Sequence, residues 1–175
     1  LEKMTGSFGE AVELAGRVLN IEGRVEPVTL SDVTLCVEGV DGRPVKGQFT
    51  IAHQEIAKRP KIWLEPTAVA NPAAVRAILR ADLVVVAPGN LYGSLAPVLV
   101  IDGIRRALHE TRAKCVYVCN LVTKPGPTDG FTVKDFASEI ERLAGGEFLD
   151  YVVFNNDEPS PELMEKYAHG GELVV

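Results

Sequence analysis

The spacing of hydrophobic residues changes in character near residue 61 of the chain. Before that point, apolar and polar residues alternate over 24–29 and 32–38, as expected of strands with one buried face. Asp41-Gly42 then gives a strong turn signal, and a further strand is expected at about 43–51. We therefore predict an antiparallel β-hairpin module, inserted at about 24–52.

After about residue 61, short apolar runs alternate with helical segments, which is typical of βαβ units joined by right-handed crossovers. The expected strands are 62–64, 82–87, 114–119 and 151–154; the expected helices are 8–19, 72–80 and 97–110, with two more opened by Thr132 and Ser160. The run at 82–87 does not alternate, which predicts a strand buried on both faces. The fold class is therefore α/β, with a mostly parallel sheet covered by helices.

Capping residues mark where these helices begin. Ser7 and Glu10 fit a capping box ahead of apolar residues at helical spacing. Asn71 is a good N-cap and is followed by a proline in the first turn. At the other end of the chain, Gly170-Gly171 predicts a helix stop just after His169.

Length, charge and cysteine content narrow the class of protein. The 175 residues suit one domain, and 24 acidic against 18 basic residues give a net charge of -6. This balance argues against a nucleic-acid partner, which needs clustered basic residues. Cys36, Cys115 and Cys119 lack metal-site or disulfide spacing, so we expect buried thiols in a reducing cytosol and no bound metal. No apolar stretch approaches the roughly 20 residues that cross a bilayer, so a soluble, cytoplasmic protein without a membrane partner is expected.

Three loops are expected to line one crevice. The carboxyl ends of parallel strands lie on the same side of a sheet, so the loops after Ala87, Cys119 and Phe154 should meet there. Glycines in these loops permit close approach of the backbone to a ligand, and backbone N–H groups ahead of a helix favour an anion. A phosphate is therefore the expected guest. The candidate ligand-binding residues are Gly89, Asn90, Leu91, Tyr92, Ser94, Asn120, Thr123, Lys124, Gly126, Thr128 and Asn155.

Each candidate also has a purely structural interpretation. Asn and Gly make turns, so Asn120 or Asn155 could simply cap the segment that follows. Tyr92 could stack on a base or pack on its own helix. The hydroxyls of Thr123 and Thr128 could bind a sugar or stabilise a long loop. Lys124 could be a solvated surface lysine. The meeting of three such loops at one edge favours a site.

Signatures of catalysis are scarce. His53, His109 and His169 all lie outside the three loops. There is no Ser/His/Asp order, nucleophile elbow or metal-ligand spacing in the sequence, and Asp129 is the one carboxylate we carry as a candidate acid, base or magnesium ligand. The residues themselves favour a binding site over a reaction.

Several motifs together resemble one family. They are Met4-Thr5-Gly6-Ser7-Phe8, Gly23-Arg24-Val25-Glu26-Pro27-Val28-Thr29-Leu30, Ala81-Asp82-Leu83, the loop 88–94, and Val116-Tyr117-Val118-Cys119-Asn120-Leu121-Val122-Thr123-Lys124-Pro125-Gly126. The chain resembles the CofD/YvcK-like family, which includes the bacterial gluconeogenesis factor and the 2-phospho-L-lactate transferase. The second loop is more similar to the gluconeogenesis-factor branch. At the first loop Ala87, Asn90 and Gly93 stand where the branch usually has Gly, Ser and Thr, and Lys124 stands where the family often has Gln.

The resemblance implies a Rossmann-like, three-layer α/β/α fold. It also implies that residues 1–175 are the carboxyl-terminal part of one such domain, with the hairpin insertion at about 24–52 and the βαβ core at about 61–175. The family's glycine-rich and acidic amino-terminal motifs do not occur in this sequence, which opens on Leu1 and closes on an apolar run, as though cut at both ends. We therefore expect self-association, or pairing with a chain that carries the amino-terminal part.

The resemblance also implies a function. The first expectation is a regulatory protein that binds a nucleotide sugar such as UDP-N-acetylglucosamine and acts in gluconeogenic growth, cell shape and envelope metabolism. The alternative is an enzyme that transfers a phospholactyl-type group from a nucleotide diphosphate donor, with magnesium in the full-length protein. No cofactor is expected in residues 1–175 themselves. An NAD-dependent oxidoreductase is a third, weaker hypothesis, because no GxGxxG turn is present.

Overall fold

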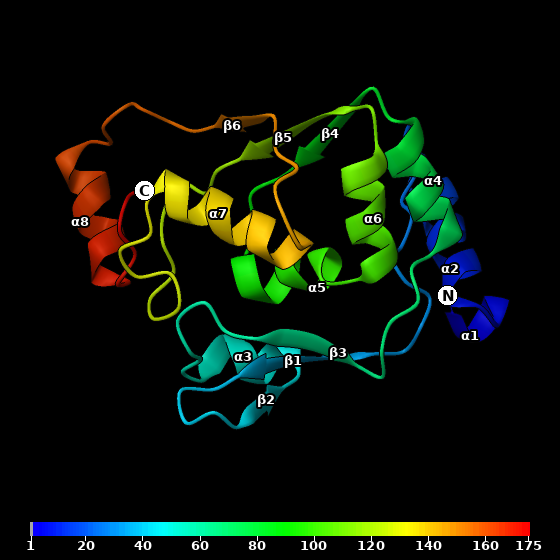
Figure 1. Cartoon of the computed structure of the whole chain (residues 1–175), viewed down its shortest axis with the longest axis horizontal. Helices are drawn as coiled ribbons and strands as arrows, with labels where there is room; N and C mark the ends of the chain where they lie inside the picture. The colour runs from blue at the N-terminus through cyan, green and yellow to red at the C-terminus, as the bar shows by residue number, and fades with distance from the viewer. Residues whose placement is uncertain (1) are drawn as a thin grey trace.

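The computed structural model describes residues 2–175 and contains two separate three-stranded sheets (Figure 1). The antiparallel sheet has the order β2-β1-β3, with β1 at Thr34–Glu38, β2 at Pro44–Lys46 and β3 at Ile62–Glu65. The parallel sheet has the order β4-β5-β6, with β4 at Leu83–Val86, β5 at Lys114–Val118 and β6 at Tyr151–Val153. The predicted α/β class, with a parallel sheet and an antiparallel module, is confirmed.

Most helices begin where the sequence predicts. The helices are α1 (Glu2–Thr5), α2 (Phe8–Val18), α3 (Gln48–His53), α4 (Pro72–Arg80), η1 (Leu91–Leu95, a π-helical turn), α5 (Ala96–Leu99), α6 (Asp102–Glu110), α7 (Val133–Ala144) and α8 (Pro161–His169). The side chains of Ser7, Asn71, Thr132 and Ser160 each accept a hydrogen bond from a backbone N–H of the following turn. This satisfies one orphan donor in each first turn, so these four predicted starts are confirmed.

The antiparallel module differs from the prediction in two places. Strand β2 ends at Lys46, because Gly47 adopts a positive φ of 86° and its carbonyl accepts from Ile51 N, which starts α3. The predicted strand at 43–51 is therefore wrong beyond residue 46. The segment 24–29 is not a strand either: the carbonyls of Pro27 and Val28 accept from the side chain and backbone of Asn71 rather than from a neighbouring strand. The third strand of the sheet is β3, which pairs with β1.

The predicted helix at 97–110 is two helices. Helix α5 ends at Leu99, and Ile101 has extended dihedrals, φ -79° and ψ 118°, before α6 begins. This break turns the chain so that Leu99, Ile101 and Ile104 all lie in the core. Helix α7 packs beside α5 with Phe136 and Ile140 buried.

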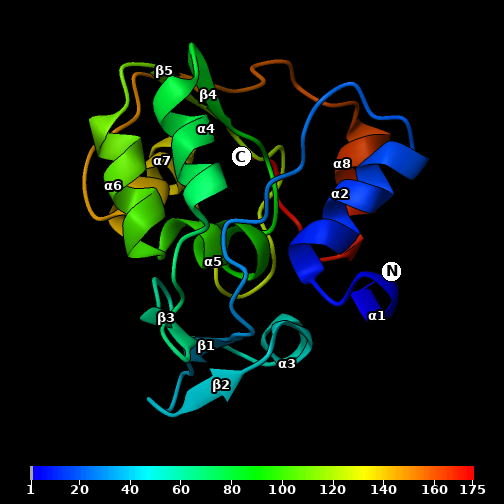
Figure 2. The same cartoon turned by 90° about the vertical axis from the view of Figure 1, so that its right-hand side faces the viewer.

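The two faces of the parallel sheet differ sharply. Cys115 and Tyr117 of β5 point toward α5, α6 and α7 and are buried. On β4, Leu83 and Val85 point the other way and are 54% and 50% exposed. Successive side chains of a strand face opposite sides, and among residues 2–175 helices cover one side of this strand. Within these residues, the prediction that β4 is buried on both faces is therefore wrong. Helices α2 and α8 lie on the side of β4 away from α6 and α7 (Figure 2).

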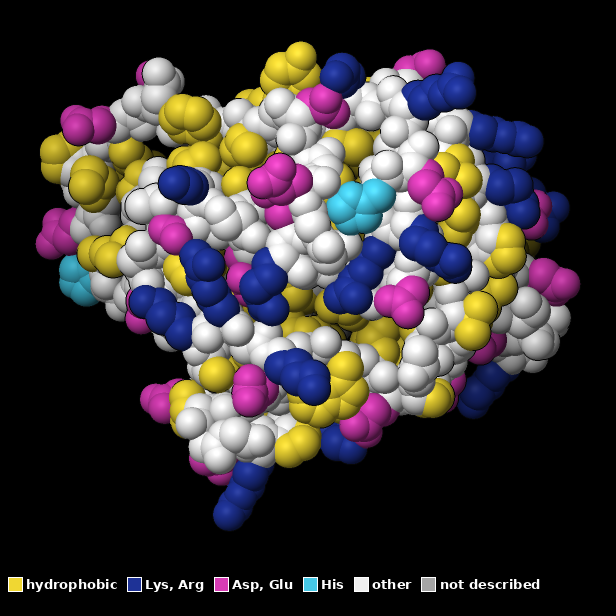
Figure 3. All heavy atoms as spheres, viewed as in Figure 1, with side chains coloured by type: hydrophobic (Ala, Val, Ile, Leu, Met, Phe, Trp, Pro, Cys, Tyr) yellow, Lys and Arg dark blue, Asp and Glu magenta, His cyan; other side chains and the backbone are white. Residues whose placement is uncertain are grey.

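The seam between the module and the parallel layer is held by basic side chains. Arg59 forms an ion pair with Asp135 at 2.8 Å, and its guanidinium lies 5.6 Å from the ring centre of Phe131. Arg142 of α7 donates to the carbonyl of Pro60 at 3.0 Å. Figure 3 shows lysine and arginine side chains gathered along this seam, above the module. These contacts fix the module against α7 and the loops of the parallel sheet.

All three cysteines are free and buried, as expected. Across residues 2–175, no helix combines the length and the apolar character that crossing a bilayer requires.

Candidate functional site

The loops after β4 and β5 are tied together at the carboxyl edge of the parallel sheet. Asn120 Nδ2 donates to the carbonyl of Gly89 at 2.9 Å, and Asn120 Oδ1 accepts from the Tyr117 hydroxyl at 3.2 Å. Asn120 therefore joins the two loops. In the third loop, the Asn155 side chain closes its own turn with the backbone of Asp157.

A small cavity of about 80 Å³ lies where the first two loops meet the antiparallel module. It is lined by Gln48, Ile51, Gln54, Ile56, Asn90, Tyr92, Gly93, Lys124, Pro125 and Pro127. Gln48 begins α3 and Gln54 follows it, and neither was predicted as a site residue. Gln48 lies in the segment 43–51 that was predicted as a strand. The one signal was the Gly47 that interrupts the alternation after Lys46. Of the predicted site residues, Asn90, Tyr92 and Lys124 line this cavity.

Asn90 and Gly93 both line this cavity and are hydrogen-bonded to each other. Asn90 Oδ1 accepts from Gly93 N at 2.9 Å and so caps η1. A Cβ atom at position 93 would lie 3.3 Å from the Asn90 side chain, which is tight. The two departures from the usual family motif in this loop, Asn90 and Gly93, are therefore matched to each other. Asn90 is exposed, and within residues 2–175 its amide nitrogen has no hydrogen-bond partner.

Lys124 lines the cavity, and Ser94 follows the lining residue Gly93 in sequence. Both side chains are exposed. Within the described residues 2–175, neither the Ser94 hydroxyl nor the Lys124 ammonium has a hydrogen-bond or ion-pair partner. Together with the Asn90 amide they offer two donors and one positive charge, which is the chemistry that recognises phosphate oxygens.

Leu91 and Tyr92 are 3% and 2% exposed, so their side chains are part of the core. The Tyr92 hydroxyl donates to Glu139 Oε1 at 3.0 Å, and Arg142 donates two hydrogen bonds to the same carboxylate. Burial, and then the negative charge of Glu139, raise the pKa of Tyr92 well above its ordinary value. Of the two hypotheses for Tyr92, packing is the one the structure supports.

Thr123 and Thr128 stabilise the second loop. The Thr128 hydroxyl accepts from Lys124 N at 2.7 Å and donates to Lys124 O at 2.9 Å, which closes a turn beneath Lys124. Thr123 exchanges hydrogen bonds with Leu173 near the end of the chain. Both side chains are buried, and these hydrogen bonds stabilise the loop. Gly126 has a φ of 90°, as this turn requires.

The site holds few groups that could move a proton. Asp129 is exposed in the second loop and does not line the cavity. His53, His109 and His169 each contact a backbone carbonyl elsewhere. Burial raises the pKa of the Cys119 thiol, which disfavours its nucleophilic thiolate form. Over the described part of the chain, no three His, Cys, Asp or Glu side chains cluster as a metal site would need.

Comparisons with known proteins agree with one another. The family model described as 2-phospho-L-lactate transferase CofD matches residues 1–175. A Thermotoga maritima protein, provisionally named a gluconeogenesis factor, is 37% identical over all of this chain and 55% of its own length. The gluconeogenesis factor of Bacillus subtilis is 34% identical over 95% of this chain and 53% of its own length.

The fold is also similar to a solved structure. A crystal structure of a UPF0052-family protein from Bacillus halodurans superposes with a TM-score of 0.91 at 30% sequence identity. The match covers 99% of this chain and 56% of that chain. The chain thus spans about half the length of the relatives it matches, and corresponds to their carboxyl-terminal portion.

Proposed function

Because the chain belongs to the CofD family, we propose that its carboxyl-edge cavity holds one end of a nucleotide diphosphate donor in a CofD-like group transfer. In such a reaction a hydroxyl oxygen of the acceptor attacks the phosphorus of the transferred group. The bond from that phosphorus to the bridging oxygen breaks, the nucleoside monophosphate leaves with the bonding electrons, and the acceptor loses its hydroxyl proton.

The observation that carries this proposal is that Asn90 and Lys124 line one cavity, with the exposed Ser94 next to the lining residue Gly93 in sequence. Lys124 provides the positive charge and the other two provide donors for phosphate oxygens. The volume of about 80 Å³ suits one end group, because pockets for whole small molecules measure about 300–1,000 Å³. The rest of the nucleotide therefore extends beyond the cavity, away from Tyr92.

The cavity does not make a magnesium site by itself. None of its ten lining residues is a carboxylate, and amide oxygens alone are poor replacements for the acidic ligands of this ion. A metal that neutralises the diphosphate would need ligands from outside residues 2–175 or from Asp129 after movement of its loop. We assign no step to it.

A second function is favoured by the names of the relatives. Proteins of the gluconeogenesis-factor group match the whole chain, and the cavity contains no side chain placed as a general acid or base. The same donors and charge suit the diphosphate of a nucleotide sugar such as UDP-N-acetylglucosamine. In this form the protein binds the nucleotide sugar as a regulatory signal for gluconeogenic growth, cell shape and envelope metabolism, and catalyses nothing. Either function places it in the cytoplasm, in keeping with its free buried thiols.

Calorimetry and a turnover assay on the product of the whole gene separate these functions. GDP and UDP-N-acetylglucosamine are titrated in parallel, and release of nucleoside monophosphate is followed with a phospholactyl donor and a deazaflavin acceptor. Turnover supports the transferase, and binding of the UDP-sugar without turnover supports the regulator. The absence of heat with both ligands and of any turnover would exclude both.

Two variants locate the site in the same experiment. Asn90→Asp keeps the acceptor that caps η1 but places a negative charge at the cavity, and Lys124→Gln removes the positive charge. Each should weaken binding about tenfold, which is about 1.4 kcal/mol. Lys134→Gln on α7 is the control, since Lys134 is exposed and does not line the cavity.

A further inference from the structure

The cavity at the carboxyl edge is lined by two parts of the chain. The loops of the parallel sheet contribute Asn90 and Lys124, and the antiparallel module contributes Gln48 and Gln54. Both glutamine side chains are exposed, and within residues 2–175 neither side-chain amide has a hydrogen-bond partner. A side-chain amide carries both donors and an acceptor, so each part of the lining offers polar groups to a ligand. The affinity of the cavity therefore depends on how the module is placed relative to the loops.

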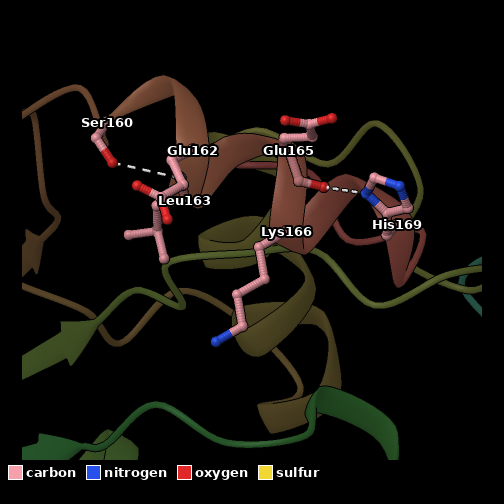
Figure 4. Close-up of a pocket in the computed structure, with 6 residues that line it drawn as sticks. All are labelled: Ser160, Glu162, Leu163, Glu165, Lys166 and His169. Carbon is pink, nitrogen blue, oxygen red and sulfur yellow. Dashed lines mark hydrogen bonds between the residues drawn. The ribbon is translucent and has the colours of Figure 1, made fainter.

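The hollow along α8 is built differently. It measures about 570 Å³, and all its lining residues come from the single segment 160–169 (Figure 4). Two of its polar side chains are bonded within that segment: the Ser160 hydroxyl accepts from Leu163 N, and the His169 ring contacts the carbonyl of Glu165. The placement of the module has no part in the shape of this hollow.

Arg142 links the module to the loop after β4 through a chain of hydrogen bonds. Its guanidinium donates twice to the buried carboxylate of Glu139, at 2.7 and 2.6 Å, and once to the carbonyl of Pro60, at 3.0 Å. The same carboxylate accepts from the hydroxyl of Tyr92, which lines the cavity. Pro60 follows Gln54 by six positions. The hydrogen bonds thus run from one part of the lining to the segment that carries the other.

Apolar contacts alone do not fix the module so closely. Ile51 and Ile56 of the module share one core cluster with Leu91 and Leu99, but burial of apolar surface is not directional. A guanidinium held by both oxygens of a carboxylate presents its remaining N–H groups in defined directions. Pro60 has no backbone N–H, so its carbonyl is the one group through which a hydrogen bond can hold it.

We propose that Arg142 is a positioning residue for the cavity: by holding Pro60 against the buried Glu139, it places Gln48 and Gln54 of the module where they contact the bound ligand. The inference rests on the proposed function, because it needs a phosphate-bearing ligand in the cavity. Arg142 is not among the lining residues, so it acts through Pro60 rather than by touching the ligand. The module then contacts a part of the ligand beyond the phosphates, and hydroxyl or amide groups on that part would match the two glutamines.

Hydrogen–deuterium exchange of the whole gene product, without ligand, tests the placement of the module. Arg142→Gln removes the guanidinium and its hydrogen bond to Pro60. We expect the backbone amides of 54–61 to exchange about fivefold faster in this variant, while those of β5 exchange as in the wild type. Near-ultraviolet circular dichroism verifies that the variant keeps its fold.

Arg105→Gln is the matched control. Arg105 also donates to two carbonyls, those of Leu99 and Leu143, and its side chain is 33% exposed against 42% for Arg142. Its partners lie in α5, α6 and α7 rather than in the module. The control therefore removes the same charge from the same layer and should leave exchange in 54–61 unchanged. Equal exchange of 54–61 in the two variants would overturn the proposal.

Calorimetry then connects the placement of the module to binding. The whole gene product is titrated with UDP-N-acetylglucosamine and, separately, with inorganic pyrophosphate, which has no group beyond its phosphates. Arg142→Gln should weaken binding of the nucleotide sugar about tenfold and of pyrophosphate less than about twofold, whereas Arg105→Gln should change neither. An equal loss for both ligands, or no loss for either, would contradict the proposal. If the wild type binds neither ligand, the proposed function fails, and the exchange of 54–61 still decides whether Arg142 fixes the module.

Discussion

Two sets of polar side chains at the carboxyl edge of the parallel sheet behave in opposite ways. Tyr92 and Thr128 are buried, and every hydrogen bond they make is to another part of the chain. Asn90, Ser94 and Lys124 lie within a few positions of them in sequence but are exposed. The buried set holds the two loops in place, whereas the open set is the one that we propose binds a ligand. Substitutions in the first set should therefore change stability, and substitutions in the second should change binding.

The largest effect is expected at Glu139. Its carboxylate is fully buried and accepts from Tyr92 and Arg142. Glu139→Ala leaves both donors without their acceptor, and breaking a buried pair costs about 3–5 kcal/mol. Because the Arg142 side chain is 42% exposed and can be solvated, we expect the lower end, about 3 kcal/mol, in urea unfolding. Exposed Glu147 on the loop after α7 provides the control, and an equal loss for Glu147→Ala would contradict this account.

Tyr92→Phe should give the next largest effect. It removes the hydroxyl that donates to Glu139 but keeps the ring in the core, and a hydrogen bond to a charged group contributes about 1.5–3 kcal/mol. We expect a loss of about 1.5 kcal/mol in the free energy of unfolding and unchanged affinity for the nucleotide. Tyr151→Phe, at a half-exposed position, serves as the control. A loss of affinity for the nucleotide without a loss of stability would contradict this account, because it would show that Tyr92 contacts the ligand.

A double-mutant cycle tests the match between Asn90 and Gly93. Gly93→Ala alone should give no gain in stability, because its Cβ would press on the Asn90 side chain. In an Asn90→Ser background, the shorter capping side chain leaves room for a Cβ atom at position 93. Gly93→Ala should then raise the free energy of unfolding by up to about 1 kcal/mol, because alanine is favoured over glycine in a helix. A coupling energy of about 1 kcal/mol between the two positions is therefore expected from urea unfolding of the four proteins. Additive effects would show that the two positions are independent.

The smallest expected effect is a change in the free energy of unfolding with pH. It arises from Asp135, which lies in the first turn of α7 and takes part in its capping box. Hydrogen bonds from Thr132, and then the charge of Arg59, lower the pKa of Asp135 below its ordinary value. A lowered folded-state pKa stabilises the protein at pH values above the unfolded-state pKa of about 3.9, and this contribution disappears as the pH falls through the folded-state value. Wild type should exceed Asp135→Asn in stability at pH 6, and the difference should shrink at pH 3. A difference that grows on acidification would contradict the assignment.

The sequence predicted the fold best where a local chemical rule decides the structure. Asn71, Thr132 and Ser160 start helices through their own side chains, and Asp41-Gly42 makes the turn between β1 and β2. The prediction from sequence was wrong where packing between distant parts of the chain determines the structure. The apolar run of β4 is compatible with two buried faces, but whether both are covered depends on elements distant in sequence.

The same distinction explains the candidate site. The carboxyl-edge position of the loops follows from the order of strands and was predictable. Whether Tyr92 turns inward depends on Glu139, 47 positions away, and no local pattern reveals that contact. Gln48 and Gln54 reach the cavity because Gly47 ends a strand early, which alternation alone could not show.

A structure of the whole gene product with bound nucleotide tests the central claim most directly. Crystals are soaked with GDP and, separately, with UDP-N-acetylglucosamine. The account predicts phosphate oxygens within hydrogen-bond distance of the Ser94 hydroxyl and the Asn90 amide, with Lys124 beside them and Tyr92 still bonded to Glu139. A nucleotide whose phosphates lie elsewhere, with Asn90, Ser94 and Lys124 all in solvent, would contradict it.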